Sequence, residues 1–134
     1  MGRSLYRSFA FVLKLLLMDV SYLQERFAHL DWRQQLGNLA STLARVSTRA
    51  SSLEHDKLIV DLLQEAALLI EWGARHIPKP FQLVIATIQK EVLAWRRVWP
   101  LDTARPLLAL TARNRSDRLL EMAGLVGPQH HRSS

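Results

Sequence analysis

The chain has 134 residues, of which 49% are hydrophobic and 22% charged, a composition typical of one folded domain and not of a disordered chain. It contains no cysteine, which excludes disulfides, thiolate metal sites and cysteine nucleophiles, and we expect a cytoplasmic protein. The formal net charge of +6 favours partners that carry negative charge, such as acidic proteins, nucleic acids or anionic membranes.

The first predicted helix runs from about Ser4 to Leu30, because its apolar residues recur at spacings of three and four. Its first half carries a second apolar row, so we expect that half to project from the domain and to need cover. A homodimer would provide this cover. The predicted self-association residues are Leu5, Tyr6, Phe9, Leu13 and Leu17.

The same N-terminal segment allows two other interpretations. The apolar run at residues 9–18 resembles part of a signal peptide, but Lys14 interrupts it and no small-residue cleavage site follows. It is also shorter than the roughly 20 residues that a membrane-spanning helix requires. Peripheral membrane contact through residues 1–17 remains an alternative to self-association, and Met18 is a second candidate for the start of the chain.

The middle of the chain predicts two more helices. Asp31 and Gln34 form a capping-box pattern at the start of the second helix, and Gly37 inside it indicates close packing against another backbone. Ser51 and Glu54 offer a similar cap for the next helix. Residues 58–73 are apolar in nearly every direction around that helix, so we expect the other helices to surround it.

The C-terminal half predicts a fourth helix over residues 81–99, with Pro80 in its first turn and Pro100 after its end. A short fifth helix is expected from Pro106 to Arg113, and a final one from Ser116 to Gly124. The predicted fold is therefore all-α: a helical bundle of four main helices with two short C-terminal helices. It forms a single domain over residues 1–127, followed by a flexible tail at 128–134.

Motifs that would indicate an enzyme are missing from the sequence. No histidine stands three residues after a glutamate, as di-metal sites in helical bundles require, and there is no nucleophile elbow or phosphate-binding loop. Asp61 and Glu65, four residues apart, favour structural ion pairs over a metal or acid–base role. We therefore expect no catalytic activity, no cofactor and no metal.

The strongest positive signal is a group of arginines near two tryptophans, Trp95 and Trp99. Arginine and tryptophan are enriched at the energetic centres of protein interfaces. The predicted function is a non-catalytic interaction module, such as an adaptor, assembly factor or regulatory subunit, that binds a protein partner, best an acidic one, and forms a homo-oligomer. The predicted partner-binding residues are Arg96, Arg97, Trp99, Arg105, Arg113, Arg115 and Arg118.

Nucleic-acid binding is the alternative interpretation of this basic C-terminal segment. Arginines can contact phosphates while an exposed tryptophan stacks on a base. Residues 105–125 also have the outline of a helix-turn-helix unit, with a turn at residues 114–116. Because that outline fits many helix pairs that never contact DNA, a protein partner is favoured.

Overall fold

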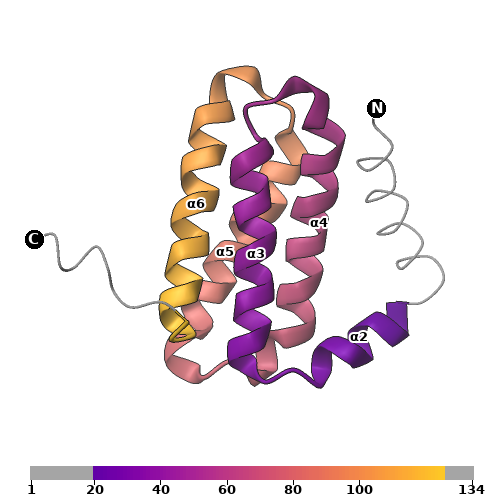
Figure 1. The fold of residues 1–134 in the computed structure, drawn as a ribbon, viewed down its shortest axis with the longest axis vertical. Coiled ribbons are helices and arrows are strands. Elements are labelled where there is room, and N and C mark those ends of the chain that lie inside the picture. The colour runs from indigo at the N-terminus through magenta and orange to yellow at the C-terminus, as the bar shows by residue number, and fades with distance from the viewer. Residues whose placement is uncertain (1–19, 126–134) are drawn as a thin grey trace, which may run out of the picture.

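The computed structural model describes residues 20–125, and every regular element within them is helical. A short helix, α2 (Val20–Ala28), precedes four long ones: α3 (Trp32–Arg49), α4 (Asp56–Gly73), α5 (Lys79–Val98) and α6 (Arg105–Met122). Three 3-10 turns lie between them, η1 (Leu53–His55), η2 (Ala74–His76) and η3 (Asp102–Ala104). Consecutive long helices run in opposite directions and form a four-helix bundle, which α2 leaves at one end (Figure 1). The predicted all-α bundle is confirmed.

Several helix ends follow from local sequence signals. The Asp31 carboxylate accepts a hydrogen bond from the backbone N–H of Gln34 at 2.8 Å, and the Gln34 side chain accepts one from the Asp31 N–H at 3.1 Å. This completes the predicted capping box of α3. The predicted cap of α4 by Ser51 and Glu54 is wrong. The turn η1 intervenes there, and α4 begins at Asp56 without a side-chain cap.

The C-terminal segment forms one helix where two were predicted. α6 continues through residues 114–116, so the short fifth helix, the final helix and the helix-turn-helix outline are all corrected. Ser116 does not cap a helix. Its buried hydroxyl donates to the carbonyl oxygen of Ala40 on α3 at 2.8 Å. Packing against α3 therefore keeps α6 helical across the polar residues 114–116, which had suggested a turn.

α6 ends in a Schellman motif, close to the predicted Gly124. The N–H of Leu125 donates to the carbonyl of Leu120 at 2.9 Å, and the N–H of Gly124 donates to that of Glu121 at 3.0 Å. Gly124 adopts a φ of 73°, which a side chain would oppose. The motif turns Leu125 toward Gly37, where a Cβ atom would lie 3.0 Å from its Cδ1. Gly37 thus packs against a side chain and not against the backbone that we expected.

Small residues bring α3 and α6 into the most extensive contact in the bundle. Ser47 on α3 donates to the carbonyl of Ala109 on α6 at 2.7 Å, and Ser116 on α6 donates back to that of Ala40 on α3. A hydroxyl on a single carbon can reach the backbone of a neighbouring helix only when the two helices lie close together. Serine and alanine at this seam permit that approach.

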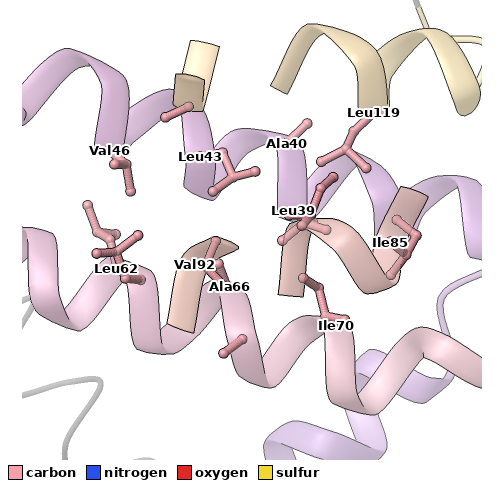
Figure 2. Packing of buried hydrophobic residues seen from close by; sticks show 14 of the residues in the cluster. Leu39, Ala40, Leu43, Val46, Leu62, Ala66, Ile70, Ile85, Val92 and Leu119 are labelled. Atoms are coloured by element: carbon pink, nitrogen blue, oxygen red, sulfur yellow. The ribbon is translucent and has the colours of Figure 1, made fainter. Parts of the chain in front are cut away.

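The helices of residues 20–125 do not surround α4 as its sequence predicted. α4 lies at one corner of the bundle, with α3 and α5 on its two flanks, because four helices of similar length each contribute one side to a shared core. Figure 2 shows side chains of α3, among them Leu39 and Val46, facing Leu62 and Ile70 of α4. All four residues are buried.

α2 corresponds to the end of the long first helix that was predicted, and it is attached to the bundle at its C-terminal end. Phe27 packs on Trp72 with ring centroids 6.3 Å apart, and its carbonyl accepts a hydrogen bond from the side chain of Gln35 at 3.0 Å. The chain then turns at residues 29–31 into α3. The predicted self-association residues and the tail at 128–134 lie outside the described residues.

No helix within residues 20–125 combines the length and the apolar character needed to cross a membrane.

Candidate functional site

Arg105, a predicted partner-binding residue, lies inside the bundle. Its guanidinium donates to both oxygens of Asp56, at 2.7 and 2.9 Å, and also to Asp102 and to the carbonyl of Ala50. The hydrogen bonds from Arg105 hold the pKa of Asp56 below its ordinary value, although partial burial opposes this. They also raise the pKa of Arg105 itself. Arg105 therefore joins α6 to α4 and does not belong to an exposed contact face.

Trp99 is buried as well. Its ring packs edge-on against Trp95 with centroids 6.3 Å apart, and the guanidinium carbon of Arg105 lies 5.0 Å from the ring centroid. Trp95 is partly buried against the core. Because Trp99 is buried, its ring is not exposed for base stacking or for a partner, and both predictions for this residue are corrected.

Two further predicted arginines form ion pairs. Arg115 contacts Glu91 of α5 through both guanidinium edges, the Nε to Oε1 distance being 2.7 Å, and these hydrogen bonds raise the pKa of Arg115. The pair connects α6 to α5, two helices whose mutual contact is less extensive than that between α3 and α6. Arg118 is half-exposed and lies 3.9 Å from Glu121 on its own helix.

The other three predicted arginines, Arg96, Arg97 and Arg113, are exposed on the surface. Arg96 lies near Asp61 of α4, close enough for its charge to favour the ionised carboxylate. Arg97 and Arg113 make no ion pair within the part of the chain that the structure describes. The seven predicted residues are therefore divided among a buried cluster, an α5–α6 contact and separate surface positions, and they do not form one face.

The structure adds two residues that the sequence reasoning missed. Leu107 and Leu110 are 56% and 59% exposed on the side of α6 that faces away from the core. They stand three residues apart, and Arg113 and Asn114 continue the same side. We call these four residues the α6 face. The sequence feature that could have predicted these exposed leucines is the unbroken apolar run at residues 107–110. A helix in a bundle cannot bury four consecutive side chains, so some of them must be exposed.

A groove of about 320 Å³ opens between α2, α3 and α4. Glu65 lies in its wall, where it accepts hydrogen bonds from Thr42 at 2.7 Å and from Arg45 at 3.0 Å. The ion pair predicted for Glu65 is thereby confirmed. Its other lining residues are Arg26, Phe27, Leu30, Asn38, Ser41 and Leu69. Glu65 is the one carboxylate among the described lining residues, and its hydrogen bonds tie α4 to α3.

Asp61 behaves differently from Glu65, its neighbour one turn along α4. Burial raises the pKa of Asp61 to about 6, even though the charges of Lys57 and Arg96 favour its ionised form. Its Oδ2 is buried without a hydrogen-bond partner. Across residues 20–125, no three histidine, aspartate or glutamate side chains gather where they could hold a metal ion. Asp61 is therefore a partly buried carboxylate with one buried oxygen and two nearby cations.

Comparison of the chain with protein-family models, characterised proteins and solved structures gives no match.

Proposed function

We propose that the chain is a non-catalytic protein-interaction module whose partner docks on the α6 face. The observation that carries this proposal is the exposure of Leu107 and Leu110, one turn apart, on a helix whose opposite side is well packed. Neighbouring apolar side chains on a surface mark contact sites more often than scattered ones do. Proteins that bind a helix commonly contact its residues at positions i, i+3 and i+7. On α6 these positions are Leu107, Leu110 and Asn114.

The charge around the α6 face favours an acidic partner. Arg113 adjoins Leu110 on the same helix and has no ion pair among the described residues. Arg97, near the end of α5, is likewise exposed and adds positive charge to the surface outside the α6 face. Arginine at the rim of an apolar contact adds hydrogen bonds and steers an acidic surface into place.

The decisive comparison uses three forms of the full chain as bait in affinity capture. Leu107→Gln/Leu110→Gln removes the apolar part of the α6 face, whereas Leu83→Gln changes a leucine that is 79% exposed on α5. Neither change removes core packing, so both variants should keep the wild-type helical circular dichroism. We expect a partner that is retained by wild type and by the Leu83 variant and lost by the double variant. Identical retention by all three would contradict the proposal.

The same variants distinguish a protein partner from nucleic acid. Fluorescence titration with duplex and single-stranded DNA and RNA at two salt concentrations measures any phosphate contacts. Weak binding that disappears near physiological salt, and that is unaffected by Leu107→Gln/Leu110→Gln, is the result expected for a protein-binding module. Tight binding that persists at physiological salt and weakens in Arg97→Gln/Arg113→Gln would favour the nucleic-acid alternative instead.

A further inference from the structure

The groove between α2, α3 and α4 takes its lining from one side of each helix. On α3, residues 38, 41, 42 and 45 recur at spacings of three and four, so they form one continuous strip. Glu65 and Leu69 stand one turn apart on α4, Phe27 comes from the end of α2, and Leu30 lies in the turn that joins α2 to α3. We call this hollow of about 320 Å³ the α2 groove.

The α2 groove combines an apolar interior with a polar rim. Phe27 is buried, and Leu30 and Leu69 are partly buried. The exposed residues of the lining are all polar or charged: Arg26, Asn38, Ser41 and Arg45. Small-molecule sites have this composition, and a volume of about 320 Å³ lies at the lower end of their range. A protein partner would instead spread over a broader surface.

The charges of the lining favour an anion. Two arginines and one glutamate line the groove, which gives a net charge of +1. Glu65 is paired with Arg45, which makes this contact through one terminal nitrogen and keeps about half of its side chain exposed. Arg26 is exposed, and it forms no ion pair within residues 20–125. Its guanidinium carbon lies 5.8 Å from the centroid of the Tyr22 ring. Arg26 is therefore the positive charge of the groove that no described carboxylate balances.

Contacts at the end of α2 hold the walls of the groove in place. The carbonyl of Phe27 accepts the hydrogen bond from Gln35 at 3.0 Å, and the Phe27 ring packs on Trp72. The same ring lies so close to Gly73 that a Cβ atom there would be 3.1 Å from it. Because these contacts fix α2 against α3 and α4, a ligand would not have to order the site on binding.

We infer that the α2 groove binds a small amphipathic anion, a molecule with an apolar body and one carboxylate or similar acidic head. The apolar body contacts Phe27, Leu30 and Leu69 in the interior. The acidic head accepts hydrogen bonds from Arg26 and Arg45 at the rim, since a guanidinium donates well to oxyanions. The inference is independent of the proposed function, because the α2 groove shares no residue with the α6 face.

Nuclear magnetic resonance titration of the full-length protein can locate and measure this binding. Sodium octanoate is the probe, and 1-octanol, which has the same apolar chain without the charge, is the neutral control. We expect octanoate to shift the backbone amide signals of Leu30, Asn38 and Ser41 until they saturate. Octanoate should bind about tenfold more tightly than 1-octanol because its head makes charged hydrogen bonds.

Two variants separate the charged from the apolar contribution. Arg26→Gln removes an exposed charge and should weaken octanoate binding by about fivefold without changing the affinity for 1-octanol. Leu30→Ala shortens a side chain of the interior and should weaken the binding of both ligands by about fivefold. The matched control Arg113→Gln changes an exposed arginine of α6 and should affect neither ligand.

Four outcomes would overturn the inference. Equal affinities for octanoate and 1-octanol that Arg26→Gln leaves unchanged would mean that the groove does not select an anion. Saturable shifts elsewhere, for example at Leu107, would place the binding site outside the groove, and the absence of saturable shifts at millimolar octanoate would mean that there is no such site. Tighter binding of a capped leucine–aspartate dipeptide than of octanoate would assign the groove to a protein segment.

Discussion

The guanidinium of Arg105 grips the carboxylate of Asp56 at both oxygens, joining the first residue of α6 to the first residue of α4 across 49 positions of sequence. Asp102 adds a third carboxylate oxygen, and the Trp99 ring covers one side of the guanidinium. The cluster fixes the connection between α5 and α6 to the start of α4, at the end of the bundle opposite α2.

Asp56→Asn should destabilise the protein by about 1–2 kcal/mol near pH 7, less than for a fully buried ion pair because the Asp56 carboxylate is partly exposed. The folded state lowers the pKa of Asp56, so its contribution to stability is present above the unfolded pKa and disappears as the pH falls through the lower folded value. Urea unfolding at several pH values measures the difference. Asp102→Asn, whose side chain is 76% exposed, is the control and should change stability by less than about 0.5 kcal/mol.

Asp61→Asn should stabilise the protein at neutral pH, whereas Asp56→Asn should destabilise it. Burial raises the folded pKa from 3.8 to about 6, so the folded state binds the proton more tightly and wild-type stability falls as the pH rises between these values. The variant should be more stable than wild type by about 1 kcal/mol at pH 7–8, allowing for partial solvent screening, and equal to it near pH 3. Asp117→Asn, an exposed carboxylate on α6, serves as control. A variant that is no more stable than wild type at pH 8 would contradict the raised pKa.

Gly73→Ala should loosen the attachment of α2. A Cβ atom at Gly73 would lie 3.0 Å from Oε1 of Gln35 and 3.1 Å from the ring of Phe27, both of which are buried. Relieving this overlap should lower the free energy of unfolding by about 1–2 kcal/mol and increase amide hydrogen exchange in α2.

Gly37→Ala is the matched comparison for Gly73→Ala. Its Cβ atom would meet only the tip of the exposed Leu125 side chain, which can move aside. Because alanine favours helix over glycine by up to about 1 kcal/mol, this variant should be neutral or more stable in the same urea experiment. Equal destabilisation by both substitutions would show that the contacts at Gly73 are not the cause.

Arg115→Gln should weaken the contact between α5 and α6. Its ion pair with Glu91 is about one-third exposed on both sides, so a double-mutant cycle with Glu91→Gln should give a coupling energy of about 0.5–1 kcal/mol. The coupling should fall when the salt concentration is raised to 1 M, since exposed charges are then screened over about 3 Å. A coupling energy of zero at low salt would show that the Arg115–Glu91 ion pair does not stabilise the protein.

Several features set by neighbouring residues were predictable from the sequence, whereas the local cap at Ser51 and the helix break at residues 114–116 were wrong. The capping box at Asp31, the prolines in the first turns of α5 and α6, and the end of α6 at Gly124 all depend on residues within one or two turns. Each of these signals acts through the backbone of its own helix, so no knowledge of the tertiary fold was needed.

Features set by distant residues were not predictable. Nothing near Arg105 in the sequence distinguishes it from Arg113, yet the first meets Asp56 and is buried while the second is exposed. Similarly, α4 is the most apolar helix by composition, whereas the tightest seam lies between α3 and α6, where Ser47 and Ser116 look polar in the sequence. Helix proximity depends on side-chain size at the contact, which an apolar-residue pattern does not measure.

The seam between α3 and α6 has a consequence for biosynthesis. The serine contacts join residues that are 62 and 76 positions apart in the sequence. α3 therefore leaves the ribosome well before α6, the helix that packs against it. Until α6 is synthesised, a nascent chain carrying α3, α4 and α5 exposes the apolar surface that α6 later covers. Chaperones recognise exposed apolar surface of this kind. Slowing translation after α5 should therefore lengthen the period in which this protein is vulnerable to aggregation.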